Sequence, residues 1–369
     1  MPSSRLKPIR RLAAIGLAAL CGCQPPPPIK VGFIGDLSAR VSELAIDGHD
    51  GAQLAIETLN AQAGPRYELR LHDDAPAAGA TGGAIDSAAD EGDAFAVGPM
   101  TSIDAQVLVA EATRRHLVLI SPSANADDLR GIDDYFFRVV PSAGQGAEQL
   151  AQIAIARGLR TAAVMADGRN LGYSEAFAKT FSARYEALGG SVGSLTHDAG
   201  SQNPDNAKMA AALLSTHPQL VLLVCSAPDA SVIAQQLRRL DPGLQLEVAA
   251  WAANLKLLQL GGRAVEGALV LQALDLDSQA PAYLDFRKRF IARFGNDPSQ
   301  AAVFSYEAVM VGATGLLHKA DDQSLRDALR APGQWPGLQQ PIVFDRFGDS
   351  MSRFRLSVVR DGRFAMLPL

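Results

Sequence analysis

The chain has 369 residues, of which 48% are hydrophobic and 20% are charged, and its formal net charge is −5 at pH 7. An acidic chain without a basic stripe is not typical of nucleic-acid-binding proteins, so we expect no nucleic-acid partner. A chain of this length is longer than one hydrophobic core usually serves, which predicts two lobes.

The first 22 residues have the pattern of a secretory signal. Basic side chains come first, and Leu12 to Leu20 then forms a short apolar run. This run is shorter than the roughly 20 residues that span a bilayer. A basic start followed by a short apolar core is typical of an export signal. We therefore assign residues 1–22 to a signal peptide rather than to a transmembrane helix.

The end of this signal resembles the bacterial lipobox, in which a leucine and then a small residue precede a lipidated cysteine. Leu20 and Gly22 hold these positions relative to Cys23. The pattern predicts a lipid anchor on Cys23 at the periplasmic face of the cell envelope; an ordinary signal peptide with incidental cysteines is the alternative. Residues 23–28 then form a tether, because consecutive prolines favour a stiff, extended helix. Cys225 is left as a single thiol in an apolar run and is expected to be inert.

Strand and helix patterns alternate along the first part of the chain. The expected strands are residues 29–34, 67–71, 94–97 and 117–120, and the expected helices are residues 48–62, 77–91 and 103–116. Such alternation favours parallel strands joined by right-handed crossovers, hence a doubly wound sheet.

The same alternation starts again after a strand at residues 135–139. It predicts helices at residues 146–157, 173–188, 204–215 and 227–240, with strands at residues 161–165, 191–196, 220–225 and 246–250. The last third adds strands at residues 268–272, 341–344, 354–360 and 364–367, and helices at residues 281–294, 301–319 and 325–329. The predicted fold class is α/β, with two doubly wound lobes.

An ordered series of motifs resembles a known family. The chain contains GHDGAQLAIETLNAQAG, LRLHDDA, VGPMTS, LISPSANADDL and FFRVVPSAGQG, followed by AVEGALV, YEAVMVGATGL and VFDRFGD. In this order they resemble the type I periplasmic solute-binding proteins of the leucine/isoleucine/valine-binding branch, the receptors of branched-chain amino acid ABC transporters. The resemblance covers nearly the whole mature chain.

The resemblance implies two lobes joined by three crossovers, here near Pro141, Leu274 and Pro332. The N-terminal lobe would be residues 29–140 plus 275–331, and the C-terminal lobe residues 141–274 plus 332–369. Ligand would bind between the lobes, at the carboxyl ends of the strands. Open α/β sheets in general bind ligands there.

Polar residues follow two predicted strands of the first lobe. Ser102 precedes a predicted helix, where its hydroxyl and N–H are placed to hold a carboxylate; a helix N-cap is the alternative role. The resemblance places Ser123, Ala124 and Asn125 where the family grips the carboxylate and the amine of its ligand. A solvent-facing turn is the alternative for these three residues.

Two positions of the second lobe correspond to aromatic contacts of the family. Leu171 stands where an aromatic residue commonly precedes a glycine, and Tyr173 follows closely. We count both among the expected ligand-binding residues.

The stretch from Ala249 to Leu255 departs from the family, because it lacks the acid that pairs with a ligand's ammonium. Trp251 and Asn254 stand there instead. An ammonium without a counter-charge is costly to desolvate. The ligand is therefore not a plain α-amino acid unless Asp36 or Asp167 supplies the charge; Asp36 is otherwise a turn or cap residue.

No catalytic or cofactor motif occurs in the chain. It has no glycine-rich dinucleotide loop, no P-loop and no His-Glu-x-x-His. Residues 189–193 match Gly-x-Ser-x-Gly, but they open a predicted strand, whereas a nucleophile elbow lies between a strand and a helix, so no such elbow is expected. His72, Asp73 and Asp74 are adjacent, but neighbouring residues of a strand point to opposite faces, so we expect no metal site. The chain is predicted to be a binding protein without a cofactor rather than an enzyme.

The predicted function is capture of a small polar ligand (an amino acid, an amide or a related carboxylate) by hinge closure. The expected partners are that ligand, an ABC permease in the inner membrane, and the membrane itself through the lipid. An envelope lipoprotein of similar fold that regulates a cell-wall enzyme, or senses amides, is the alternative.

Overall fold

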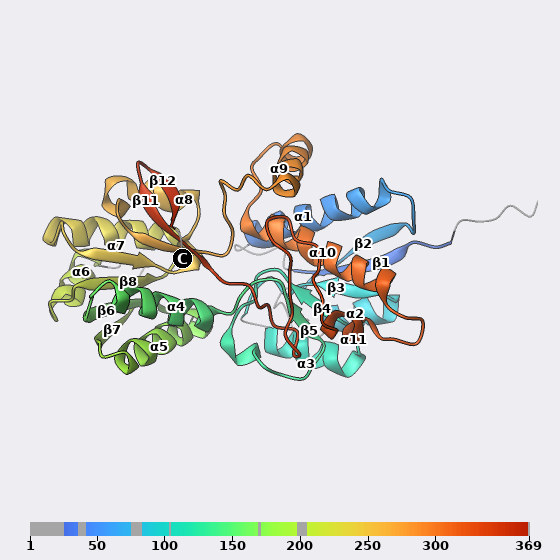
Figure 1. The fold of residues 1–369 in the computed structure, drawn as a ribbon, viewed down its shortest axis with the longest axis horizontal. Coiled ribbons are helices and arrows are strands. Elements are labelled where there is room, and N and C mark those ends of the chain that lie inside the picture. The colour runs from blue at the N-terminus through green and yellow to red at the C-terminus, as the bar shows by residue number, and fades with distance from the viewer. Residues whose placement is uncertain are drawn as a thin grey trace, which may run out of the picture.

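The computed structural model describes residues 26–35, 42–74, 83–102, 105–168, 171–197 and 205–367. Two α/β lobes lie side by side and are joined by several passes of the chain (Figure 1). The predicted signal peptide, Cys23 and Asp36 lie outside the described residues.

The N-terminal lobe is built on a parallel sheet with the strand order β2-β1-β3-β4-β5. Its strands are β1 (Ile29–Ile34), β2 (Tyr67–His72), β3 (Phe95–Val97), β4 (Leu119–Ser121) and β5 (Phe136–Arg138). One face is covered by α1 (Ser42–Asn60), α9 (Pro281–Phe294) and α10 (Gln300–His318), with α11 (Leu325–Arg330) beside α10. The other face is covered by α2 (Gly83–Glu91) and α3 (Ala105–Arg115). The predicted doubly wound sheet is confirmed.

The C-terminal lobe is built on a sheet with the strand order β12-β11-β10-β9-β8-β6-β7. Its strands are β6 (Thr161–Asp167), β7 (Ser191–His197), β8 (Leu220–Val224), β9 (Gln245–Val248), β10 (Leu269–Gln272), β11 (Arg355–Arg360) and β12 (Arg363–Leu367). The last two strands are antiparallel to their neighbours, and the others are parallel. One face is covered by α4 (Ala143–Ala156) and α5 (Leu171–Ala187), and the other by α6 (Asn206–Leu214), α7 (Ala227–Leu240) and α8 (Leu255–Gly261).

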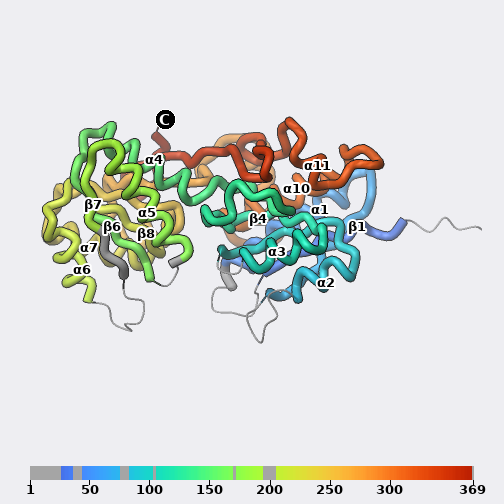
Figure 2. The backbone as a smooth tube through the Cα atoms, turned by 90° about the horizontal axis from the view of Figure 1, so that it is seen from below, coloured from blue at the N-terminus to red at the C-terminus, as the bar shows by residue number. Residues whose placement is uncertain are grey.

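The chain crosses between the lobes three times among the described residues. The first crossover links β5 to α4, and the second links β10 to α9. The third comes just before β11, where the C-terminal segment runs from one lobe to the other along one edge of the molecule (Figure 2).

The third crossover lies later than Pro332, where the sequence placed it. Leu338, Ile342 and Phe344 pack in the core of the N-terminal lobe, whereas Phe354 packs in the C-terminal lobe. The segment expected as a strand at residues 341–344 makes only isolated bridges. Helix α11 ends at Arg330, just before Pro332, but the chain does not leave the first lobe at that point. The apolar side chains that follow Pro332 pack in the core of this lobe and keep the chain there.

Helices α1 and α10 approach each other closely at a glycine. A Cβ atom on Gly51 would lie 2.0 Å from the carbonyl oxygen of Ala302, so no larger residue fits. Helix α10 is also apolar and long enough to span a membrane, and within the described residues it is the one helix of that kind. Most of its residues are buried in the core of the N-terminal lobe, which explains its apolar sequence without a membrane.

Candidate functional site

Two loops at the carboxyl ends of β3 and β4 carry the predicted serine residues. After β3 the chain turns at Gly98, whose φ is +136° and whose Cβ, if present, would lie 2.6 Å from the carbonyl oxygen of Ile34. Ser121 ends β4 and donates its hydroxyl proton to the carbonyl oxygen of Pro99 at 2.8 Å. The same hydroxyl accepts the backbone N–H of Ala124 at 2.8 Å. The buried Ser121 hydroxyl thus fixes the two loops against each other.

The predicted ligand-binding serines also join these loops. The Ser123 hydroxyl donates to the carbonyl oxygen of Met100 at 2.6 Å. The Ser102 hydroxyl accepts the backbone N–H groups of Asn125 at 3.2 Å and Ala126 at 3.3 Å. A hydroxyl that accepts two hydrogen bonds still has its own proton to donate. Ser102 can therefore donate to a ligand acceptor, whereas the Ser123 proton is already used.

The other two residues of this loop differ in exposure. Ala124 is fully buried, so only its backbone is placed to meet a ligand. Asn125 is half-buried, and its carbonyl oxygen accepts the backbone N–H of Ala143 at 2.7 Å. Because Ala143 opens α4, this bond ties the loop to the first crossover.

Two predicted aromatic residues of the C-terminal lobe contact each other. The rings of Tyr173 and Trp251 meet edge to face, with centroids 5.9 Å apart. Burial raises the pKa of the Tyr173 hydroxyl, which also forms a hydrogen bond with the backbone of Trp251. Tyr173 is buried and Trp251 is half-buried, so Trp251 is the more accessible of the pair. For Leu171 the structure describes only the backbone, at the first position of α5.

Asn254 has a local structural role. Its side chain accepts the backbone N–H of Lys256 at 3.0 Å and caps α8, a helix that the sequence pattern did not predict. An N-cap side chain stabilises a helix by about 1 kcal/mol, which accounts for an asparagine here without a ligand. Its assignment to the ligand site stays a prediction.

Two residues outside the prediction connect the site loops to the rest of the fold. The Gln300 side chain at the start of α10 reaches across the lobes to the carbonyl oxygen of Ala253, at 3.4 Å. Arg138 is fully buried and donates to the carbonyl oxygen of Ala126 at 2.8 Å. An arginine inside an apolar strand pattern was the one sequence signal for this second contact.

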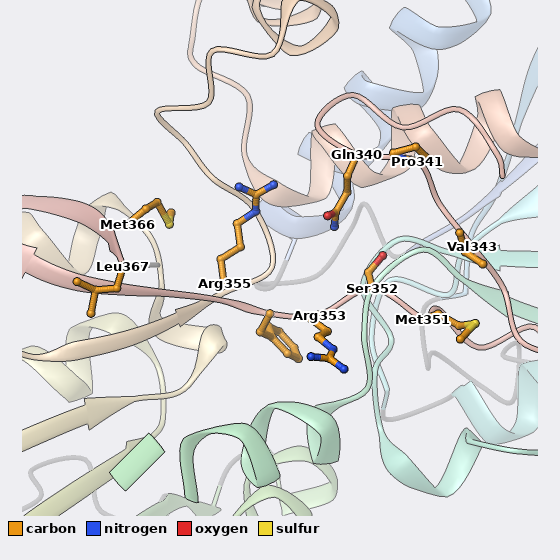
Figure 3. A pocket seen from close by; sticks show the side chains of 10 residues that line it. Gln340, Pro341, Val343, Met351, Ser352, Arg353, Arg355, Met366 and Leu367 are labelled. Carbon is orange, nitrogen blue, oxygen red and sulfur yellow. The ribbon is translucent and has the colours of Figure 1, made fainter. Parts of the chain in front are cut away.

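A groove of about 600 Å³ lies elsewhere, along the third crossover (Figure 3). It is lined by Gln340, Pro341 and Val343, by the crossover residues Met351 to Arg355 and by Met366 and Leu367 of β12. None of the predicted site residues lines it. Because open α/β sheets bind ligands outside the carboxyl ends of their strands, we place the candidate site at the strand-end loops and not in this groove.

The described residues contain no cluster of metal-ligating side chains. His72 instead pairs with a carboxylate inside the N-terminal lobe, with its Nε2 atom 2.7 Å from Oδ2 of Asp93. Both side chains are buried, so this pair belongs to the core.

A family model described as periplasmic binding protein matches residues 28–362. The chain belongs to the periplasmic binding protein family. A curated relative, the Leu/Ile/Val-binding protein BraC3 of Rhizobium johnstonii, is 25% identical over 344 residues, which cover 88% of this chain and 89% of the relative.

Solved structures share the fold at low sequence identity. A leucine-binding protein from Thermotoga maritima superposes with a TM-score of 0.79 at 20% identity, covering 92% of this chain and 98% of that one. A solute-binding protein of an ABC transporter from R. palustris, in complex with benzoate, gives a TM-score of 0.78 at 19% identity and covers 92% and 96% of the two chains. The predicted resemblance and fold class are confirmed.

Proposed function

We propose that this protein is an extracytoplasmic receptor that captures a small polar ligand between its lobes and delivers it to an ABC importer. The observation that carries the proposal is the family match, which runs through both lobes and all three crossovers. The loops from both lobes that would meet the ligand are already tied together, by the Gln300 to Ala253 bond and by the Ala143 to Asn125 bond.

Closure explains how binding is reported to a partner. A ligand that touches both lobes stabilises the closed form, because only there does it make both sets of contacts. The Ser102 proton, the Asn125 amide and the backbone N–H groups after β4 would hold polar atoms from the N-terminal side. Trp251 would cover the ligand from the C-terminal side. These contacts bind without chemical change, and a micromolar Kd, about −8 kcal/mol, is expected.

The ligand class we propose is an amino acid, an amide or a related carboxylate. The relatives support this range, since one is named for leucine, isoleucine and valine and another was solved with benzoate. We further propose that Cys23 carries lipid, because Leu20 and Gly22 precede it at lipobox spacing. Incorporation of a palmitate label that persists after Cys23→Ser would contradict the anchor.

A panel of these compounds tests the proposal by thermal unfolding and calorimetry on the mature protein. At 100 times its Kd, a true ligand should raise the free energy of unfolding by about 2.7 kcal/mol. Ser102→Ala should weaken binding of a carboxylate about tenfold, the usual effect of losing one hydrogen bond. Ser215→Ala is the control, because that exposed hydroxyl only bonds to the end of its own helix.

Failure of every compound to stabilise the protein would contradict this function. Co-purification with a cell-wall enzyme, with no ligand response, would instead favour the envelope regulator.

A further inference from the structure

Both lobes contribute to the groove along the third crossover (Figure 3). Pro341 and Val343 flank Ile342, which packs in the core of the N-terminal lobe. Met366 and Leu367 belong to β12, which pairs with β11 in the sheet of the C-terminal lobe. The volume of about 600 Å³ is that of a small-molecule site. A molecule in this groove would therefore touch both lobes and the segment that joins them.

Two arginine residues line the groove, and no acidic residue does. Arg353 is exposed, and its guanidinium has no hydrogen bond or ion pair with any described residue. The Nη1 atom of Arg355 lies 3.6 Å from Oδ2 of Asp275, which is too far for a hydrogen bond. The two arginine side chains leave the crossover in different directions (Figure 3). The groove thus offers positive charge that the described part of the fold does not neutralise.

Apolar side chains form most of the remaining wall. Met351 is 61% exposed, and a ligand that covered it would remove apolar surface from water. Met366 and Leu367 are half-buried and line the same groove. Unbranched methionine side chains adapt to the shape of what they contact. The wall therefore suits an apolar chain of no fixed shape.

A small recess continues from the groove into the hinge, and Gln340 and Ser352 line both. Its volume of about 20 Å³ is too small for a ligand, but it contains the acid Glu307. One oxygen of Glu307 accepts the backbone N–H of Leu338 at 2.6 Å. Burial raises the pKa of Glu307 to about 8, so at pH 7 this acid keeps its proton and does not repel an anion.

Charge and wall together select the chemistry of an occupant. The planar fork of an arginine binds a carboxylate through two parallel hydrogen bonds. A carboxylate brings one negative charge beside the apolar wall, whereas a phosphate monoester brings up to two, which are costlier to remove from water. A single carboxylate on an apolar chain is therefore the best match.

We propose that this groove is a second ligand site, separate from the cleft, that takes a carboxylate of the medium-chain fatty acid type and whose occupation changes the angle between the lobes. Arg353 and Arg355 would hold the carboxylate, and the methionine side chains would cover the apolar chain. Because both lobes line the groove, hinge motion changes the contacts of the occupant. A ligand that binds two states unequally shifts the equilibrium between them. The proposed receptor function does not depend on this site.

Three eight-carbon probes test the site by calorimetry on the mature protein at pH 7. Octanoate carries the carboxylate, octan-1-ol is uncharged and octylamine is a cation. Wild-type protein should bind octanoate at least tenfold more tightly than either of the other two. Arg353→Gln combined with Arg355→Gln should weaken octanoate binding at least tenfold and leave binding of octan-1-ol unchanged. Small-angle X-ray scattering should show a shift in the radius of gyration on saturation with octanoate, in wild type only.

Three further variants control the experiment. Arg353→Gln alone should weaken octanoate binding severalfold without affecting the fold, because this arginine is exposed and unpaired among the described residues. Arg114→Gln removes another exposed arginine, on α3, and should leave octanoate binding unchanged. Ser102→Ala alters the cleft, so it should not change octanoate binding in the groove.

The possible outcomes separate the groove from the cleft. Loss of octanoate binding and of the scattering shift in the double arginine variant supports the proposal. Equal binding of the three probes, equal effects of Arg353→Gln and Arg114→Gln, or an unchanged radius of gyration at saturation overturns it. Octanoate binding that falls in Ser102→Ala but not in the arginine variants places the carboxylate in the cleft, which overturns the groove site and leaves the receptor function standing.

Discussion

Replacing Arg138 with methionine should lower the free energy of unfolding by about 3–5 kcal/mol, because it leaves a buried carboxylate without its counter-charge. The Arg138 Nε atom donates to Oδ1 of Asp349 at 2.7 Å, and the arginine side chain is fully buried. The other Asp349 oxygen accepts the backbone N–H of Gly131 at 2.8 Å. This network fixes the segment before the third crossover to β5.

The same substitution should also weaken ligand binding. Arg138 holds the carbonyl oxygen of Ala126, at the base of the loop that carries Asn125 and Asp127. Without that bond the loop loses one of its fixed points, so binding should fall even under conditions where the variant is folded. Urea unfolding and calorimetry on the same preparation separate the two effects.

Two further variants control this experiment. Arg138→Met combined with Asp349→Leu removes both charges, and it should cost clearly less than the sum of the single changes. Arg114→Met removes an arginine whose side chain is 60% exposed and pairs with Asp86, so its cost should stay below about 1 kcal/mol. An Arg138→Met protein as stable as Arg114→Met would show that the buried pair does not hold the fold.

Stability should fall as the pH rises from 5 to 8, and Glu247 should cause a large part of that fall. Burial raises the pKa of Glu247 from 4.5 to about 8, and neither of its oxygens has a hydrogen-bond partner in the described part of the chain. Between these two values the folded protein keeps a proton that the unfolded chain has lost. The free energy of unfolding then decreases by about 1.4 kcal/mol per pH unit for each such group.

Glu247→Gln should remove this contribution. Its unfolding free energy should match the wild type near pH 5 and exceed it near pH 7.5, as measured by urea unfolding at several pH values. Burial also raises the pKa of Glu307 to about 8, so part of the slope should remain in the variant. Glu148→Gln changes an exposed acid, so the change of the unfolding free energy with pH should be the same as in the wild type. Equal slopes in wild type and Glu247→Gln would contradict the account.

The lobes were predictable because local patterns encode them. Short apolar runs, typical of strands, alternate along the chain with segments whose apolar residues recur at helical spacing. That alternation alone indicates parallel strands with helices on both faces. Residues such as Leu338 and Phe344 show the limit, because an apolar side chain does not reveal which of two cores it will join. The third crossover was misplaced for this reason.

The site was predictable only as far as its loops. Ser102 and Asn125 stand in neighbouring strand-end loops, as the motifs indicated, but the roles of single side chains depend on partners far away in the sequence. Arg138 and Asp349 are separated by 211 residues, so no local pattern in the sequence pairs them. We predicted Asn254 to be a ligand-binding residue because the helix that it caps is short and has no clear apolar period, so the sequence showed no sign of a helix there.

Hinge closure on a bound ligand is the central claim, and small-angle X-ray scattering measures it most directly. The mature protein is compared with and without a saturating amount of the tightest compound from the panel. The account predicts a smaller radius of gyration with ligand and a scattering curve that fits two rigid lobes moved together about the three crossovers. Identical curves at full occupancy would contradict it.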